Sequence, residues 1–332
     1  MIESLCRALC VLVLASAAAG EPHVRWIDET GVFQRAPIEA VLADTPDHVR
    51  VRLRGDKERT IPAYALVALV RERLDDPDEK RLLEIRVRVQ RGEVPEGADA
   101  LLAGLDQPIR PDWMRETVAA TRALLAANRD DPKSLQPFLD RYPASRFRAP
   151  ILRARARLAD PGDGDLWDPY EDAYVAMLRA KASYIEIGRL FRDLGVRIIS
   201  ADPGGYDTFA GALEKKIATA APKDGRANKV AWAMFSVTIR KWAQLDFALF
   251  ERADMKRQGV KPRSLLRRFE KILDGTRLLL PELRCDAARE LGITHLLCDD
   301  KNAAAGAFAI ALDSAPDPVR REEVERLVEK AK

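Results

Sequence analysis

The spacing of apolar residues changes along this chain, and the change constrains the fold more than any motif does. Val49, Val51 and Leu53 alternate with arginines, which predicts a half-buried antiparallel strand. From residue 112 onward, apolar residues recur at helical spacing instead. We therefore expect an α+β protein that is mostly α, with a small N-terminal β-barrel followed by an array of α-helical hairpins.

Residues 25–66 carry the signals for the barrel. A Trp-x-Asp-x-Thr-Gly-x-Phe opening (26–33) precedes two strand-like runs, and Gly55-Asp56 provides a turn before a short partner strand at 59–61. Pro37 interrupts the run 33–42, so that strand is expected at a sheet edge or with a bulge. None of these residues is needed for a reaction, which indicates a binding or structural module.

This segment resembles the Sla-homology module, a small SH3-like barrel of a eukaryotic endocytic adaptor that also occurs in exported bacterial proteins. Two positions depart from the family pattern: Arg25 adjoins Trp26 directly, and Val67-Ala68-Leu69 replaces a common Ser-x-x-Asp. The resemblance implies an SH3-like barrel. The matching residues are Arg25, Trp26, Asp28, Thr30, Gly31, Phe33, Ala36, Val51, Leu53, Gly55, Ile61, Pro62 and Leu66.

The first residues have the composition of a secretory signal peptide. Arg7 precedes a short apolar run at 8–15, and small residues follow at 16–20. Cleavage after Ala19 is expected, because the run is shorter than the roughly 20 residues that span a bilayer. An uncleaved anchor is the alternative. We expect no membrane span after cleavage, and a periplasmic or secreted location in a bacterial envelope.

The remaining chain is expected to divide into a barrel (20–76), helical hairpins (77–160) and a helical repeat-like domain (161–332). Residues 79–90 fit either a strand or a helix, and a helix is favoured by the Pro and Asp residues before them. Long helices are expected at 168–199 and 226–257. In the second, one apolar stripe contains Trp232, Phe235, Ile239 and Trp242, and another contains Val230, Met234 and Val237.

Residues 285–316 resemble one tetratricopeptide repeat. Leu291-Gly292, Ala304, Phe308 and Pro316 fall at the expected positions when Cys285 is counted as the first, whereas Ala288 replaces the usual Trp. The resemblance implies a helical hairpin in which Gly292 and Ala304 face each other. Helices at 262–280 and 318–331 would flank it, because a single repeat cannot bury its own face. The number of repeats stays open.

Cys285 and Cys298 are the cysteines outside the predicted signal peptide. At opposite ends of one helix they would lie about 20 Å apart, beyond the roughly 7 Å that a disulfide allows between Cα atoms. We expect two buried thiols. A redox pair would require the helix to break between them.

Few residues suggest chemistry. The three histidines, His23, His48 and His295, form no metal-binding or triad motif, and His295 occupies a packing position. The acids from Asp160 to Asp172 lack the spacing of a calcium loop and are interpreted as a linker with helix-capping aspartates. Asp299-Asp300 is expected to cap a helix. We therefore predict no catalytic, cofactor-binding or metal-binding residues in this chain.

The interspersed charges, with a net charge of +3, give no reason to expect nucleic acid. The expected function is a non-enzymatic exported scaffold or adaptor, which binds peptide or protein partners through a helical concave surface and the barrel. One alternative is an envelope hydrolase that uses unidentified carboxylates. Another is a cell-wall polysaccharide binder, which an exposed Trp26 would favour. The identity of the partner, any ligand of the barrel and the oligomeric state stay open.

Overall fold

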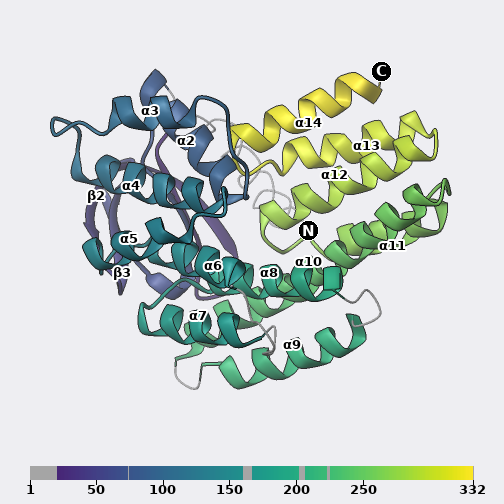
Figure 1. Cartoon of the computed structure of the whole chain (residues 1–332), viewed down its shortest axis with the longest axis horizontal. Coiled ribbons are helices and arrows are strands. Elements are labelled where there is room, and N and C mark those ends of the chain that lie inside the picture. Colours follow the sequence, from purple (N-terminus) through teal and green to yellow (C-terminus); the bar gives the residue numbers. More distant parts are fainter. Residues whose placement is uncertain (1–20, 74, 160–166, 202–205, 223–224, 332) are drawn as a thin grey trace. The chain divides into compact units, whose positions relative to one another are not determined.

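The computed structural model describes residues 21–73, 75–159, 167–201, 206–222 and 225–331 (Figure 1). An N-terminal antiparallel sheet is followed by helices, which confirms an α+β fold that is mostly α. The predicted signal peptide and residues 160–165 of the acidic cluster lie outside the described residues. The chain divides into two compact units: the first comprises residues 1–28, 34–158 and 175–183, and the second comprises 29–33, 159–174 and 184–332.

The sheet of the first unit has five strands in the order β4-β3-β2-β1-β5. Val49 and Val51 of β3 are fully buried, while Arg50 between them is exposed, as the alternation predicts. Trp26 is 6% exposed and lies in the same core as these valines and Ile61. The strands are β1 (His23–Ile27), β2 (Phe33–Asp44), β3 (His48–Leu53), β4 (Lys57–Pro62) and β5 (Leu66–Val70).

Strand β2 shows how the chain accommodates Pro37. The strand lies between β1 and β3, so of the two expected arrangements, an edge position or a bulge, it has the second. The register shifts between Ile38 and Ala40 and again between Val41 and Ala43. Phe33, the first residue of β2, is only partly buried and lies outside the sheet core. The aromatic ring of Phe33 is therefore not part of the core that contains Trp26.

Helices α2 to α6 follow the sheet in the first unit. Residues 77–90 form a helix and not a strand, because Asp76 caps it: its Oδ1 accepts hydrogen bonds from the backbone N–H groups of Asp78 (2.9 Å) and Glu79 (3.1 Å). The helices are α2 (Pro77–Gln90), α3 (Ala98–Leu105), α4 (Asp112–Ala127), α5 (Leu135–Arg141, after the short 3₁₀ turn η2, Pro132–Ser134) and α6 (Arg148–Leu158).

Charged residues attach the sheet to these helices. The buried carboxylate of Glu72, just after β5, accepts hydrogen bonds from Arg86 of α2, with an Arg86 Nη2 to Glu72 Oε1 distance of 2.7 Å. Asp44 at the end of β2 pairs with both Arg71 and Arg146. Arg146 also donates to the carbonyl oxygen of Thr45 at 2.7 Å. The segment between α5 and α6 is therefore held to the β2–β3 turn.

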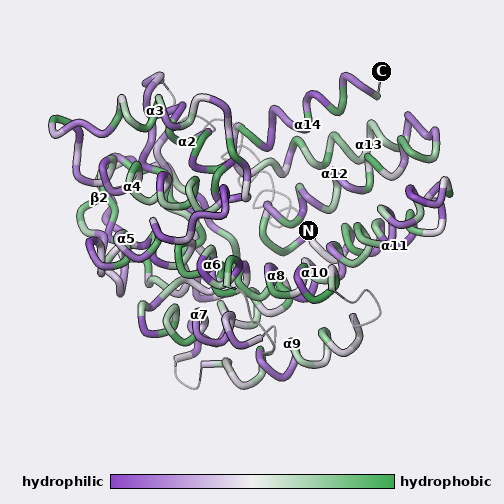
Figure 2. The backbone as a smooth tube through the Cα atoms, viewed as in Figure 1, coloured by the Kyte–Doolittle hydropathy of each residue, from purple (hydrophilic) through white to green (hydrophobic). Residues whose placement is uncertain are grey.

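The second unit is built from helices that follow one another as hairpins (Figure 1). Hydrophobic and hydrophilic residues alternate along them, as amphipathic packing requires (Figure 2). Among the described residues, no helix has both the length and the apolar character of a membrane span. The helices are α7 (Asp168–Arg179, which crosses the unit boundary), α8 (Tyr184–Ala201), α9 (Tyr206–Ala220), α10 (Arg226–Arg257), α11 (Arg263–Asp274), α12 (Pro281–Leu297), α13 (Lys301–Asp313) and α14 (Pro318–Ala331).

The long helix expected at 168–199 is wrong, because the chain leaves the helical path after Arg179. Lys181 has a positive φ of 51°. Its N–H bonds the carbonyl oxygen of Leu178, and the N–H of Ala182 bonds that of Met177. This is a Schellman ending, in which a lysine takes the left-handed position where glycine is usual. No glycine marks the break in the sequence.

Other expected helices need smaller corrections. The helix expected at 262–280 ends at Asp274, and a loop continues to Leu280. Helix α10 spans the residues expected for it, and its stripe of Trp232, Phe235, Ile239 and Trp242 is buried. The second stripe is not buried throughout, since Val237 is 40% exposed. Helix α10 is thus buried mainly along one stripe.

Cys285 and Cys298 are unbridged and buried at opposite ends of α12, as expected. Burial raises the pKa of Cys285 to about 12, and the neighbouring Asp286 carboxylate adds to the effect. The Cys285 thiol therefore stays protonated at neutral pH, and a reactive role is disfavoured.

The hairpin of α12 and α13 is tight at Gly292, as expected. A Cβ at Gly292 would lie 2.4 Å from Cε1 of Phe308, so this aromatic ring packs directly over the glycine. Ala304 is fully buried. Phe308 thus fills the space that the missing side chain leaves within the hairpin.

Gly292→Ala should destabilise the protein by about 1–3 kcal/mol, because the buried ring of Phe308 has to move. Gly306→Ala is the matched control, since a Cβ at Gly306 of α13 meets nothing within 4 Å. The Gly306→Ala substitution should raise the free energy of unfolding by up to about 1 kcal/mol, because alanine favours a helix more than glycine does. Urea unfolding of both variants measures the difference. Equal effects of the two substitutions would contradict the packing described.

Candidate functional site

The residues examined for chemistry in the sequence do not come together in the structure. His295 is buried near the end of α12, with its Nδ1 3.8 Å from Asp300 Oδ2. Asp300 caps α13, as expected, by accepting a hydrogen bond from the N–H of Ala303 at 3.0 Å. Of the acidic cluster, Glu171 pairs with Lys216 at 2.7 Å. Each of these contacts has a structural role.

Trp26 gives no support to polysaccharide binding. Its ring is 6% exposed, and the guanidinium of Arg59 lies 5.3 Å from its centroid. A tryptophan that stacks on a sugar needs an accessible face, and here the ring is buried with the guanidinium of Arg59 over it. The observation that would favour this alternative is therefore missing.

Strand β1 carries an unusual histidine. His23 is 6% exposed, and its Nδ1 lies 2.9 Å from the carbonyl oxygen of Glu21. Burial lowers the pKa of His23 to about 3, and the charges of Arg35 and Arg25 add to this effect. His23 is thus neutral at physiological pH and acts as a packing residue of the first unit.

A network of arginines and carboxylates joins four helices of the second unit. Its centre is Arg192 of α8, which donates two hydrogen bonds of 2.8 Å to the carboxylate of Asp246 in α10. Arg192 also lies 3.8 Å from Asp286 of α12. Burial alone would lower the pKa of Arg192, but the nearby carboxylates outweigh it and raise that pKa. The guanidinium is therefore permanently charged.

The network continues from α12 to the last helix. Asp286 Oδ1 lies 2.7 Å from Nη1 of Arg320 in α14, so this carboxylate faces two arginines. Asp246 and Asp286 are 9% and 5% exposed. Two charges this deeply buried require partners, because an unpaired buried charge costs several kcal/mol. The first branch of the network thus connects α8, α10, α12 and α14.

A second branch lies one turn further along α12. Glu290, 5% exposed, accepts from Arg252 of α10 at 2.5 Å and from Arg289 at 2.6 Å. Arg252 also bonds the hydroxyl of Thr294 at 3.0 Å, and Arg289 lies 3.4 Å from Glu323 of α14. We call the eight charged residues Arg192, Asp246, Arg252, Asp286, Arg289, Glu290, Arg320 and Glu323 the arginine–carboxylate network.

Sequence reasoning missed this network. Arg and Lys are interspersed with Asp and Glu along much of the chain, so the charged residues of the network do not differ in the sequence from exposed ones. In α12 the signal was a spacing of three to four residues between Asp286, Arg289 and Glu290, which puts them on one face. Neighbouring helices decide which of these charges are buried, and the local sequence pattern does not contain that information.

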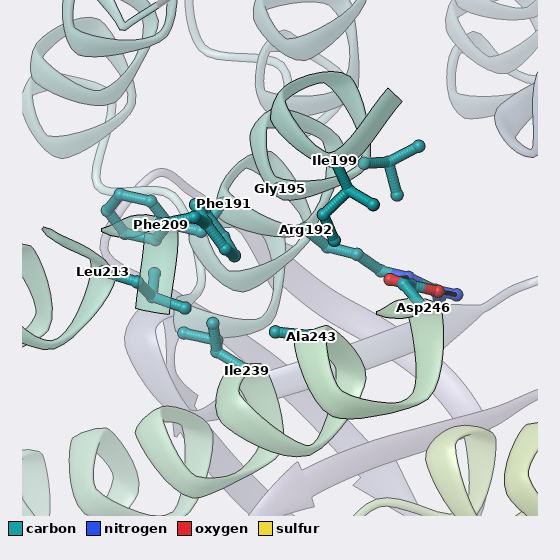
Figure 3. A pocket seen from close by; sticks show the side chains of 10 residues that line it. Phe191, Arg192, Gly195, Ile199, Phe209, Leu213, Ile239, Ala243 and Asp246 are labelled. Carbon is teal, nitrogen blue, oxygen red and sulfur yellow. Dashed lines mark hydrogen bonds and ion pairs between the residues drawn. The ribbon is translucent and has the colours of Figure 1, made fainter. Parts of the chain in front are cut away.

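A shallow pocket lies beside the centre of the network (Figure 3). Phe191, Gly195 and Ile199 of α8 form one wall, and Ile239 and Ala243 of α10 form another. The ring of Phe209 from α9 lies over Gly195, where a Cβ would be 2.6 Å from its Cζ. Arg192 and Asp246 lie at the end away from this ring (Figure 3).

The pocket is small. It encloses about 210 Å³, space open to solvent included, with no room for an enclosed water molecule. Small-molecule sites typically span about 300–1,000 Å³. Asp246 is the one acid that lines it, and both of its oxygens are held by Arg192. Within the described ranges, no group of three or more His, Cys, Asp and Glu side chains is placed to hold a metal ion.

Comparison of the chain with protein-family models, curated proteins and solved structures finds no significant match.

The pKa of His23 has a consequence for stability that can be measured. Its pKa is lower in the fold than the usual 6.5, so protonation favours unfolding. The stability contribution is complete above pH 6.5 and is lost as the pH falls toward 3. We expect the wild-type protein to lose about 2 kcal/mol more than His23→Gln between pH 7.5 and pH 5.

Chemical unfolding at the two pH values tests this expectation. His48→Gln is the matched control, since His48 is a partly buried histidine of the same sheet that bonds Thr45. The control should keep the wild-type pH dependence. If the His23→Gln variant shows the same pH dependence as the wild type, folding does not lower the pKa of His23, and the expectation is wrong.

Proposed function

We propose that this protein is an exported, non-enzymatic scaffold or adaptor that binds protein or peptide partners through its helical second unit. We interpret the N-terminal sheet as an SH3-like barrel and the helices α10 to α14 as a tetratricopeptide-like array. The order of the five strands and the α12–α13 hairpin, with Gly292 against Phe308, support these interpretations. Export rests on the sequence of residues 1–20, and the mature chain from the native host should begin near Gly20.

One observation carries the proposal: the buried charged groups of the second unit bind one another and leave no free reacting group in the pocket. A buried ion pair that holds two helices fixes their positions, but it offers no acid or base for catalysis. Helices held in this way keep a fixed arrangement, as a protein needs when partners bind to its surface. An array of this kind usually presents that surface to other proteins.

The α8–α10 pocket is where we expect a partner to anchor an apolar side chain. Val196 at its rim is 43% exposed, although its neighbours Phe191 and Ile199 are buried. Partner interfaces typically combine a small apolar pocket with a few polar groups at its edge, and here Arg192 and Asp246 provide them. The pocket is too small for a drug-sized substrate, and we expect the partner's apolar side chain to pack against its open rim beside Val196.

A crosslinking experiment tests this site. A photoreactive amino acid at position 196 should capture a partner in the native host, and the purified partner should bind the wild-type protein directly. Val196→Glu should weaken that binding at least about tenfold, as expected for a residue beside an interface anchor. Val260→Glu is the control, since Val260 is a similarly exposed valine (47%) of the same unit.

Unchanged affinity of Val196→Glu, or an equal loss in the control, would refute the site. Turnover of an envelope polymer by the purified wild-type protein would refute the non-enzymatic function.

A further inference from the structure

One face of helix α10 carries apolar side chains that are only partly covered. Val230 and Met234 are partly buried, Ala233 is exposed, and Val237 is 40% exposed. These residues recur at intervals of one to four, which places them on one side of the helix. This side is distinct from the pocket, since Ile239 of the pocket lies about 160° around the helix axis from Val237.

The loop between β1 and β2 extends this face. Residues 29–33 belong to the second unit. Gly31 has a positive φ of 84°, and a Cβ there would lie 2.9 Å from Cγ1 of Val230 and 3.9 Å from Cε of Met234. The loop therefore rests on α10 at this point, and Val32, the next residue, is 53% exposed. We call Val32, Val230, Ala233, Met234 and Val237 the α10 patch.

Positive charge surrounds the α10 patch. Residues 226–245 hold no Asp or Glu and four basic residues: Arg226, Lys229, Arg240 and Lys241. Arg226 and Lys229 are exposed, and neither forms an ion pair in the described part of the chain. Two acids are near: Glu214 of α9, whose Oε1 lies 3.5 Å from Nε of Arg240, and Glu29, the first residue of the loop. The cations therefore outnumber the acids around the patch.

We propose that the α10 patch binds an amphipathic helix of a partner protein, with acidic residues on either side of an apolar centre. Lys229 and Arg240 are eleven residues apart, about 16.5 Å along the axis and on the same side of α10. A partner helix with acids at positions i and i+11 and apolar residues at i+4 and i+7 matches this arrangement, because all four positions share one face. The short side chain of Ala233, between the two cations, allows the partner helix to approach closely.

Charge argues against a second copy of this chain as the occupant. In an antiparallel pair of α10 helices Lys229 would face Arg240, and in a parallel pair each cation would face its own copy, so like charges meet in both. A membrane surface is disfavoured because the exposed residues of the patch are two valines and an alanine, whereas membrane-binding helices typically expose Trp, Phe or Leu. The proposal adds a second contact surface to the proposed binding function, and it does not depend on the pocket.

Binding of designed peptides to the full chain tests the proposal. The first is an alanine-rich helical peptide of about 20 residues with glutamates at i and i+11 and leucines at i+4 and i+7. The second has lysines in place of the glutamates, and the third has the composition of the first with the leucines on the opposite face. Fluorescence anisotropy should show at least about tenfold tighter binding of the first peptide than of either other peptide.

Two sets of variants place the binding on the patch. Val237→Asp should weaken binding of the first peptide at least about tenfold, whereas Val260→Asp, at a similarly exposed valine (47%) of the same unit, should leave it unchanged. Arg226→Glu/Lys229→Glu should weaken binding of the glutamate peptide and strengthen binding of the lysine peptide. Both glutamates lie in the first turn of α10, where the helix dipole favours acids, so the fold should tolerate them.

The control for this charge reversal is Arg267→Glu/Lys330→Glu. It changes the net charge by the same amount at two exposed residues of α11 and α14. The control should keep the preference for the glutamate peptide. Equal effects of the two double variants would show attraction by overall charge and would overturn the proposal.

Four other results would also overturn it. Equal affinity for the glutamate and lysine peptides would remove the role of charge, and unchanged binding by Val237→Asp would place the peptide elsewhere. A wild-type dimer in analytical ultracentrifugation that Val237→Asp dissociates would assign the patch to a second copy. Binding to phosphatidylglycerol vesicles that Val237→Asp abolishes would assign it to a membrane surface. None of these results bears on the pocket of α8 and α10, which Val196→Glu tests separately.

Discussion

The second unit depends on the position of one guanidinium group. Arg192 of α8 binds Asp246 of α10 through two hydrogen bonds and lies 3.8 Å from Asp286 of α12, which in turn pairs with Arg320 of α14. Hydrophobic contacts between helices tolerate small rotations and shifts, whereas a buried charge without its partner costs several kcal/mol. The network therefore penalises arrangements of these helices that would satisfy the apolar core equally well.

Physical patterns of the residues predict the general fold and many of the elements. Alternation at Val49 and Val51 identified a strand, and the cap at Asp76 decided for a helix at 77–90. The break at Lys181 was missed because a lysine occupies the left-handed position, where a glycine is usual and would have indicated the end of the helix. The contact of the Phe308 ring with Gly292 was also missed, since a repeat pattern gives helix positions but not the rotamer of Phe308.

The candidate site could not be predicted in the same way. Asp246 and Asp286 are separated by 40 positions and resemble the exposed acids around them, so no local signal distinguishes them from a solvated surface. The pocket beside them is formed by the three consecutive helices α8, α9 and α10, and its shape depends on how these helices pack.

The central claim is that Arg192 and Asp246 stabilise the second unit as a pair, and a double-mutant cycle with Arg192→Met and Asp246→Leu tests it most directly. Each single substitution leaves a charge that has lost its main partner, so each should cost about 3–5 kcal/mol in the free energy of unfolding. The double variant should cost less than the sum of the two by at least about 1 kcal/mol. Costs that add to within about 0.5 kcal/mol would show that the two residues act independently and would contradict the account.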